Sequence, residues 1–379
     1  SVSYKYGFKN PNSWINSCEK LLDILPHDIK KNIVNLAISG TSGTLTACNL
    51  EGNPFGEAIP YDQVCNYNKT IIDSMTIGED HLQTPYSSLA KALTLIDKYG
   101  ENILLRHQSD WITGWFLKDW TYGEEGNNLK LGWDLLEESW PKSYLNTSFQ
   151  KCLPQIIKSG KIMGQIDSEI AERFKLNKNI LLISGTTDSN AAFLAAGLDE
   201  AEGLTVLGTT IVLKKVNKNP VKEKGITTHR VCGNWICGGA SNAGCGILSK
   251  FFSDAEIKEL SRQIITSKKT SLNLLPLNSK GERFPVNNPF LEPILGPRPV
   301  SDSLYLHALF EGLARIELKG WEKLCDLTGS LPKRIVTVGG GSKNPQWRII
   351  REKIINIPIV SCKKTTSFGT ALLAIDAKL

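Results

Sequence analysis

Apolar and polar positions along the chain follow two periods, one typical of helices and one typical of strands. After Pro11, for example, Trp14, Cys18 and Leu22 recur at helical spacing, and Asn10 is placed to cap this segment. Periodicity and end signals predict helices over 11–25, 84–100, 104–120, 301–329 and 366–375, and one that begins at Pro345 with Asn344 as its cap. Apolar runs and alternation predict strands over 32–39, within 179–187 and 333–338, and a β-hairpin over 203–216.

Strand and helix segments alternate in both halves of the chain, which is typical of α/β proteins with mixed sheets. The 379 residues exceed one comfortable domain, because a single hydrophobic core stops growing near roughly 250–300 residues. Near 197–200 the spacing of apolar residues changes to the alternation of a β-hairpin. We therefore expect two domains, over 1–198 and 199–379. Two stretches break the alternation and are predicted as loops: the polar, Gly-rich 121–134 and the Pro- and Gly-rich 275–299.

Composition and charge narrow the class of protein. The net charge of +6 comes from dispersed Lys without a basic stripe interleaved with aromatic residues, which argues against nucleic-acid binding but allows attraction of small anions. No apolar run approaches the ~20 residues of a membrane helix, and the first residues resemble no signal peptide, so a cytoplasmic protein without a membrane partner is expected. Nine irregularly spaced Cys indicate reduced thiols, and the spacing of Cys232, Cys237 and Cys245 does not match a zinc site. The oligomeric state stays open.

Loops rich in Gly, Thr and Ser follow predicted strands at five places. Gly lets backbone N–H groups turn toward an anion, hydroxyls add donors, and a following helix adds its positive end. An ordinary tight turn has the same composition, so a single junction is weak evidence. Five junctions, divided between the two halves of the chain, favour a phosphate-containing ligand. The P-loop pattern and the G-x-G-x-x-G dinucleotide pattern are both absent. The five junctions are 39–44, 184–189, 207–210, 238–244 and 339–344.

Asp188 is the one carboxylate placed at such a loop mouth, in "SGTTDSNAAF". It could cap the helix that follows, for which Asp is among the best residues. It could also be a general base that accepts the proton of a hydroxyl as this hydroxyl attacks a γ-phosphoryl group. The two roles are compatible, because a cap residue is held rigidly where a substrate would approach.

Four stretches together resemble the FGGY family of carbohydrate kinases, and within it the pentulose kinase branch of cyanobacteria and plants described as D-ribulokinase or xylulokinase-like. They are "GTTDSNAAFLAAG", "VLGTTIVLKK", "GGASNAGCGILSKFF" and "TVGGGSKNPQW", and they keep the family's order. The resemblance implies a two-domain, actin-like (ribonuclease-H-like) ATPase fold with an interdomain cleft. It further implies that the first domain holds the sugar, that the second holds ATP, and that Mg²⁺ bridges the phosphates.

Carried over position by position, the resemblance implies roles for named residues. Asp188 resembles the catalytic base, which also contacts the substrate, and Ser42 in "GTSGT" resembles a sugar-contacting residue with Thr44 as a neighbouring candidate. The remaining positions resemble ATP-binding ones: Gly208, Thr209 and Thr210 beside the phosphates, Gly239 in the cleft wall, and Gly340, Gly341 and Asn344 in the adenosine loop. D-ribulose is the expected acceptor, with D-xylulose as the alternative.

The chain departs from the family in two respects. Ser39 stands where relatives usually carry Asp, and the D-x-G-T-S-G loop that opens the family is absent. The stretch 1–8, "SVSYKYGF", resembles the family's third strand, so we expect a gap of about two strand spacings, roughly 10 Å, between a third and a fourth strand. A truncated product, an incomplete sequence and a rearranged sheet are all compatible with this pattern. A non-catalytic sugar- or nucleotide-binding remnant is therefore the rival to an active kinase.

Overall fold

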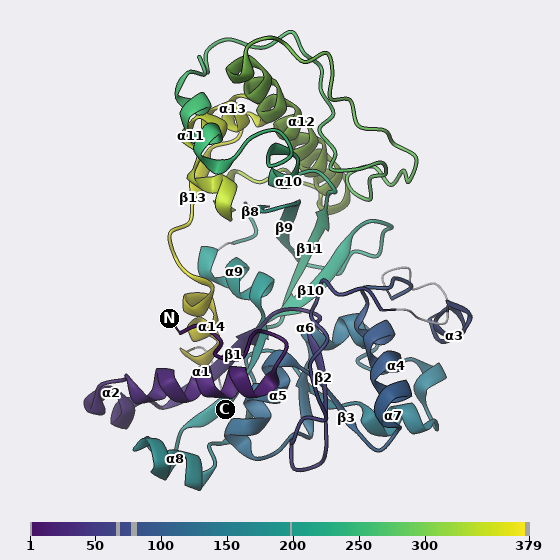
Figure 1. The fold of residues 1–379 in the computed structure, drawn as a ribbon, viewed down its shortest axis with the longest axis vertical. Coiled ribbons are helices and arrows are strands. Elements are labelled where there is room, and N and C mark those ends of the chain that lie inside the picture. The colour runs from purple at the N-terminus through teal and green to yellow at the C-terminus, as the bar shows by residue number, and fades with distance from the viewer. Residues whose placement is uncertain (1, 66–68, 77–81, 198, 376–379) are drawn as a thin grey trace. The chain divides into compact units, whose positions relative to one another are not determined.

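The chain folds into two compact units, each with its own hydrophobic core (Figure 1). The computed structural model describes residues 2–65, 69–76, 82–197 and 199–375. Unit 1 contains Ser1–Ala195, Arg230–Gly233 and Thr365–Leu379, and unit 2 contains Ala196–His229 and Asn234–Lys364. The boundary after Ala195 lies close to the one expected after residue 198, whereas the return of the C-terminal segment to unit 1 was not expected.

Unit 1 is built from short sheets and the helices around them. Its strands are β1 (Asn35–Gly40), β2 (Leu45–Cys48), β3 (Leu104–His107), β4 (Tyr122–Glu124), β5 (Gln155–Ile157), β6 (Ile162–Gln165) and β7 (Leu181–Thr187). Its helices are α1 (Pro11–Asp23), α2 (His27–Asn32), α3 (Lys69–Met75), α4 (Ser88–Tyr99), α5 (Gln108–Leu117), α6 (Glu125–Asn128), α7 (Ser148–Cys152), α8 (Ser168–Phe174), α9 (Asp188–Ala196) and α14 (Thr366–Ile375). Short 3₁₀ turns follow at Leu129–Leu131 and Lys142–Tyr144.

A three-stranded sheet of order β1-β7-β6 positions the predicted sugar-side residues. β1 runs parallel to β7, and β6 runs antiparallel to it. The long connection between β1 and β7 carries α5, which packs on both strands. The carboxyl ends of β1 and β7 therefore meet at one edge, the usual place for ligand-binding loops in parallel sheets.

Residues 2–8 contain no strand, so the predicted third strand is wrong for this stretch. Its backbone groups bond to the first helix and its surroundings instead: the Tyr6 N–H donates to the Ser13 hydroxyl at 2.9 Å, and the Phe8 carbonyl accepts from the Trp14 indole at 2.8 Å. In the described residues β1 is an edge strand of its sheet, and the predicted gap beside a third strand does not arise.

Two further predictions fail in the middle of unit 1. The helix expected over 104–120 begins only at Gln108, because residues 104–107 pair as β3 with β2 in an antiparallel ladder. The loop expected over 121–134 contains β4, α6 and a 3₁₀ turn. Both carboxylate oxygens of Glu124 accept N–H groups at the start of α6, and this capping forms a helix in a sequence of poor helix propensity.

The C-terminal helix α14 belongs to unit 1, where it packs on β1, β7 and α9. The contact with α9 depends on Gly369, because a Cβ there would lie 1.9 Å from the Ala191 carbonyl oxygen and 2.7 Å from the Ala195 nitrogen. The Thr370 hydroxyl also donates to the Ser39 hydroxyl at 2.8 Å, so Ser39 helps to hold this helix.

Gly369→Val is expected to destabilise unit 1 by about 1–3 kcal/mol or more, because the added atoms cannot be placed without separating α14 from α9. The matched control is Ala371→Val, which adds bulk at an exposed position of the same helix. Thermal unfolding and hydrogen exchange of α14 should distinguish the two variants. Equal unfolding temperatures would contradict the close packing of Gly369.

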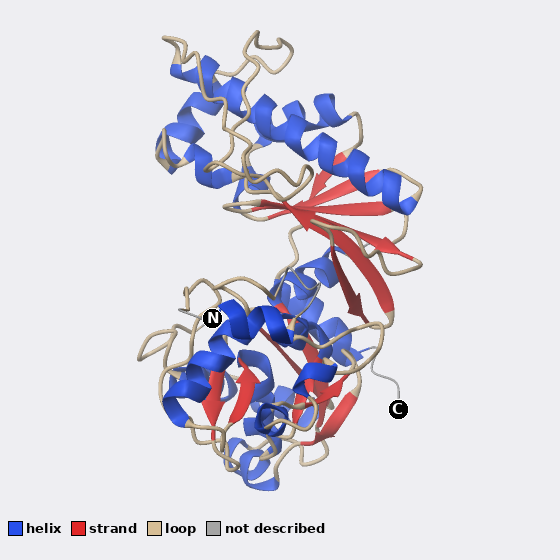
Figure 2. Ribbon diagram, turned by 90° about the vertical axis from the view of Figure 1, so that its right-hand side faces the viewer, coloured by secondary structure: helices blue, strands red, loops and turns tan. Residues whose placement is uncertain are grey.

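Unit 2 contains a six-stranded mixed sheet of order β10-β11-β9-β8-β12-β13 (Figure 2). Its strands are β8 (Glu202–Leu207), β9 (Ile211–Asn217), β10 (Thr227–Val231), β11 (Asn234–Ala240), β12 (Arg334–Val338) and β13 (Ile359–Ser361). Its helices are α10 (Cys245–Leu248), α11 (Asp254–Arg262), α12 (Asp302–Thr328) and α13 (Pro345–Ile355), with a 3₁₀ turn at Gly340–Lys343. The predicted hairpin is confirmed as β8 and β9, and the predicted extended stretch 275–299 forms no helix or strand.

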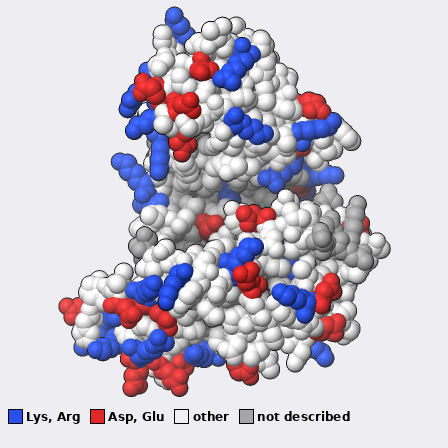
Figure 3. Space-filling model, in the orientation of Figure 1, with Lys and Arg blue, Asp and Glu red and all other residues white. Residues whose placement is uncertain are grey.

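Three further predictions concern membrane-spanning helices, the state of the Cys residues and the distribution of surface charge. None of the helices in the described residues is long and apolar enough to span a membrane. All nine Cys are free thiols, as the irregular spacing predicts. On the face drawn in Figure 3, both units carry acidic as well as basic side chains rather than a continuous basic stripe.

Candidate active site

The loop after β1 and the start of α9 are brought together by the parallel pairing of β1 and β7. The predicted loop at 184–189 does not form, because β7 extends to Thr187 and α9 begins at the next residue. Gly40 pairs with Thr187, so the next residues, Thr41 and Asp188, leave neighbouring strands side by side at a spacing of about 4.8 Å. Ser42 follows in the loop after β1 and is half-buried. The structure therefore places the predicted base and the predicted sugar-contacting residue at one edge of a sheet.

Asp188 is the first residue of α9 and is exposed. One of its carboxylate oxygens accepts the Ser189 N–H at 2.8 Å. A different residue caps the next N–H group of the helix: the Thr187 hydroxyl accepts the Asn190 N–H at 3.2 Å. Thr187 thus takes the capping role predicted for Asp188, and the Asp188 carboxylate is exposed at the start of α9, directly after β7.

The loop that carries Ser42 is a tight turn. The Thr44 N–H donates to the Thr41 carbonyl at 3.2 Å, and Gly43 in the third position has φ +82°, as a type II turn requires. Gln108, at the start of α5, fixes both ends, since its side-chain oxygen accepts the Thr41 N–H at 2.9 Å and its own N–H donates to the Thr44 carbonyl at 3.1 Å. Thr44 is fully buried, which leaves Ser42 as the better placed of the two substrate candidates.

Buried carboxyl groups that the sequence analysis did not single out lie behind this edge. Asp110 accepts the Glu124 N–H at 3.1 Å and the Asn128 side-chain amide at 3.0 Å, and Glu124 accepts the Gly126 and Asn127 N–H groups. Burial raises the pKa of Asp110 to about 7 and that of Glu124 to about 8, and the charge of Asp110 contributes to the second shift. Both acids therefore titrate near neutral pH, and the bonds of Asp110 join α5 to β4 and α6.

This buried cluster reaches the helix that begins with Asp188. A Cβ on Gly126 would lie 3.4 Å from the side-chain nitrogen of Asn190, so α6 and α9 meet there. The only sequence signal for the cluster was the run of polar residues in 121–134, which looks the same as a solvated loop when its neighbours are unknown.

In unit 2, parallel pairing again brings two predicted loops to one edge. Val338 of β12 pairs with Val206 of β8, so the loops 208–210 and 339–344 leave the same end of neighbouring strands. The arrangement repeats that of unit 1, with Gly-rich turns at the carboxyl ends of parallel strands. Such turns present backbone N–H groups to an anion.

The first of these loops is fixed by backbone bonds to the start of α10. The Gly208 carbonyl accepts the Cys245 N–H at 2.8 Å, and the Thr209 carbonyl accepts the Gly246 N–H at 3.1 Å. Within the loop, the Gly208 N–H donates to the Thr210 carbonyl at 3.2 Å. The carbonyls of Gly208 and Thr209 are thus turned toward α10, while Thr209 itself is exposed.

The second loop lies against the end of β8 because three consecutive Gly allow it. Gly339 has φ +92°, and a Cβ there would lie 2.5 Å from the Leu207 carbonyl oxygen. A Cβ on Gly341 would lie 2.9 Å from the Leu207 Cβ and 3.0 Å from the Cys245 sulfur. Gly340 is exposed with no atom within 4 Å of its Cβ position, so this backbone is open to a ligand. The predicted residues of both loops therefore share one edge of unit 2.

Two of the predicted nucleotide-binding residues have a clear packing role. The Asn344 side chain caps α13 by accepting the Trp347 N–H at 2.9 Å, and it donates to the Ser261 hydroxyl at 2.8 Å. Gly239 is buried in β11, where a Cβ would lie 2.3 Å from the Phe284 ring. These contacts are enough to explain why Asn and Gly stand at positions 344 and 239. The roles of Asn344 and Gly239 in ATP binding stay predictions.

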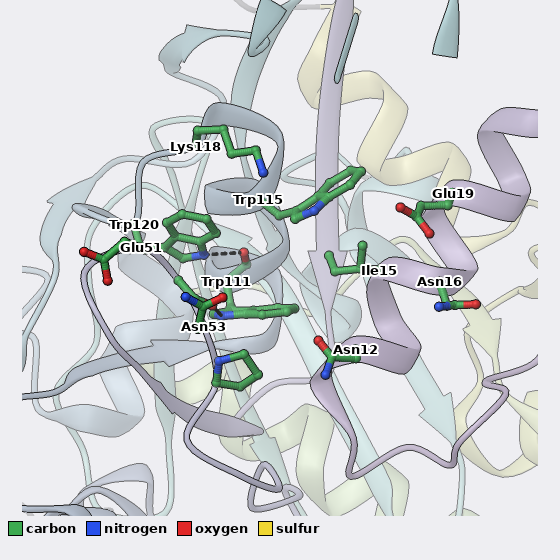
Figure 4. A pocket seen from close by; sticks show the side chains of 12 residues that line it. Asn12, Ile15, Asn16, Glu19, Glu51, Asn53, Trp111, Trp115, Lys118 and Trp120 are labelled. Atoms are coloured by element: carbon green, nitrogen blue, oxygen red, sulfur yellow. Dashed lines mark hydrogen bonds between the residues drawn. The ribbon is translucent and has the colours of Figure 1, made fainter. Parts of the chain in front are cut away.

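These edges coincide neither with a metal-binding cluster of the described residues nor with the cavity drawn in Figure 4. In the described ranges no three or more His, Cys, Asp and Glu side chains are grouped to hold a metal ion. A cavity of about 380 Å³ lies between α1, α5 and the loop 51–54 (Figure 4). Two of its indoles are engaged in packing, since Trp111 donates to the Gly52 carbonyl and Trp120 donates to the Trp111 carbonyl, both at 3.0 Å. We assign this cavity no part in the predicted chemistry.

Comparison with known proteins identifies the family. Residues 203–377 match the C-terminal domain of the FGGY family of carbohydrate kinases. This match and the related sugar kinases support an FGGY family carbohydrate kinase. The xylulose kinase of Lactococcus lactis is 24% identical over 403 residues, which cover 97% of this chain and 79% of the relative.

Solved structures of sugar kinases share the fold. A xyloylose kinase from Brucella ovis aligns with a TM-score of 0.84 and 19% identity, covering 100% of this chain and 83% of that one. The glycerol kinase of Plasmodium falciparum, solved with ADP, aligns with a TM-score of 0.79 and 20% identity, covering 99% and 82%. These likenesses confirm the predicted actin-like ATPase fold of this FGGY carbohydrate kinase. Sugar phosphorylation with ATP is the chemistry of the family.

Proposed function

We propose that this FGGY kinase transfers the γ-phosphoryl group of ATP to a terminal hydroxyl of a pentulose. The observation that carries the proposal is the edge of unit 1 where the exposed Asp188 carboxylate and the Ser42 turn leave neighbouring parallel strands. A general base must lie within hydrogen-bond reach of the hydroxyl that it deprotonates, and a carboxylate beside a rigid turn meets this requirement.

The proposal assigns roles to Asp188, to Ser42 and to the two predicted loops of unit 2. Asp188 accepts the proton of the attacking hydroxyl, and Ser42 orients the sugar. In unit 2 the backbone of 208–210 contacts the phosphates, and the loop from Gly339 to Asn344 accommodates the nucleoside. The described residues provide no resident magnesium cluster. We propose that Mg²⁺ arrives bound to the ATP phosphates, and no step here depends on a protein-held ion.

Two pentuloses are candidates for the acceptor. The motifs of the chain resemble the D-ribulokinase branch, which favours D-ribulose. The names of the Lactococcus and Brucella proteins favour D-xylulose. Both sugars are ketopentoses with a terminal hydroxyl, so the same base and the same turn serve either acceptor.

A coupled assay of ADP release with D-ribulose, D-xylulose and glycerol tests the proposal. We expect sugar-dependent turnover with one of the two pentuloses and a kcat/KM at least tenfold lower with glycerol. Calorimetry with each sugar and with ATP runs in parallel. Binding without turnover would support the rival function of a non-catalytic remnant, and turnover with glycerol alone would overturn the assignment of the substrate class.

A further inference from the structure

A buried lysine lies directly behind the turn that carries Ser42. Lys91 is in the first turn of α4, and its side chain has 0% exposure. Its ammonium group donates to the Gly43 carbonyl at 2.8 Å and to the Tyr61 carbonyl at 3.1 Å. Lysine is almost never fully buried without partners, so these two carbonyls account for its presence in the interior.

We propose that Lys91 is a positioning residue for sugar binding: by holding the Gly43 carbonyl from the interior, it fixes the turn that presents Ser42. The inference rests on the proposed function, in which this turn contacts the sugar. Lys91 is too deeply buried to touch the substrate itself. Its effect passes through the backbone of Gly43.

The turn is held from both sides, and the two sides differ in strength. Lys130, from the 3₁₀ turn Leu129–Leu131, reaches the Ser42 carbonyl from the exposed side at 3.5 Å. Lys91 holds the next carbonyl at 2.8 Å from the interior, where a bond from a charged donor is stronger than in water. The positive φ of Gly43 makes the turn sensitive to this contact, because alternative backbone conformations are open to Gly at little cost.

The charge of Lys91 responds to pH in an accessible range. Burial, followed by the nearby Lys130 charge, lowers the pKa of Lys91 to about 8, while Cys65 and Asp62 act in the opposite direction. His107 also faces this region and adds no charge near neutral pH, because burial lowers its pKa to about 3. As the pH rises through about 8, folded Lys91 loses its proton and its bonds to the two carbonyls weaken, although two donors remain.

The experiment compares the wild type with Lys91→Met across pH 6.5 to 9.5, using the preferred pentulose. We expect the sugar KM of Lys91→Met at pH 7 to rise by about tenfold, the size of one lost bond to a charged group, with the ATP KM within about twofold of the wild type. The wild-type sugar KM should rise as the pH passes about 8, and the KM of the variant should not follow this profile. The control is Lys130→Met, which removes the longer, exposed contact and should change the sugar KM by less than about threefold.

Folding of the variant is followed by thermal unfolding and by ATP calorimetry. Gly43→Ala offers a second route, because it strains the turn without removing Lys91 and should raise the sugar KM in the same way. An unchanged sugar KM in a folded Lys91→Met, or a wild-type KM that is flat across pH 8, would reduce Lys91 to a structural role. A wild type that neither binds nor phosphorylates a pentulose would overturn the proposed function and this inference with it.

Discussion

Asp188→Asn is expected to lower kcat by a factor of about 10²–10⁴, which is the usual contribution of a general base. The KM for ATP should stay nearly unchanged. Asn has almost the same shape as Asp and retains an oxygen for the Ser189 N–H, so the start of α9 should be preserved. The amide cannot accept the proton of the attacking hydroxyl. Release of ADP with the preferred pentulose measures the loss, and calorimetry with ATP checks that the binding of ATP, which we propose for unit 2, is retained.

The control for this variant is Asp199→Asn. Asp199 is also exposed, and its carboxylate also accepts a nearby backbone N–H, that of Ala201 at 2.7 Å. It lies outside the loops that carry the predicted chemistry, so its replacement should change kcat by less than about twofold. If both variants retained wild-type turnover, Asp188 would lose its assigned role as the general base.

Local pattern was enough to predict the longest helices and the longer strands such as β1, β7, β8 and β9, because these elements are defined by their own sequence. The long helix α12 has its apolar stripe, its Ser301 cap and its terminal Gly329 within the segment itself. The junctions at 39–44, 207–210, 238–244 and 339–344 were predicted in the same way, since Gly and Thr after an apolar run are local signals. At 184–189 the predicted loop is wrong, because β7 passes directly into α9. The predictions failed where a partner decides the structure, as at Leu104–His107, which become a strand only by pairing with β2.

The residues of the candidate site also fall into those that a local motif predicts and those whose role depends on a distant partner. Asp188 and Ser42 could be named from motifs, because their loops have a recognisable composition. Lys91 and Asp110 could not, since nothing in their sequence surroundings separates a buried lysine or acid from the many exposed ones. Their roles depend on the Gly43 carbonyl and the Glu124 N–H, which are distant in sequence and become neighbours only in the folded unit. The return of α14 to unit 1 could not be predicted for the same reason, because it depends on contacts with α9 that are distant in sequence.

The most deeply buried ion pair of unit 2 joins its two long helices. Arg351 of α13 makes two bonds to the Glu317 carboxylate of α12, at 2.6 and 2.7 Å, and both side chains are at most 1% exposed. Thr205 of β8 donates to Glu317 at 2.6 Å, and Thr337 of β12 accepts from Arg351 at 3.1 Å. The pair therefore ties both helices to β8 and β12, the two strands whose ends carry the predicted nucleotide-binding loops.

Arg351→Met is expected to destabilise unit 2 by about 3–5 kcal/mol, because it leaves the Glu317 carboxylate buried without its counter-charge. The double variant Arg351→Met, Glu317→Leu should be less destabilised than the single one, since it removes the stranded charge as well. Arg262→Met is the control: Arg262 pairs with Glu259 at 2.9 Å, but both side chains are more than 60% exposed, and a cost below about 1 kcal/mol is expected. Hydrogen exchange of α12 and α13 measures the opening free energy locally, so the stability of unit 1 does not enter. Equal protection in the two single variants would mean that the buried pair contributes no more than a surface one, and that α12 and α13 are held by apolar packing alone.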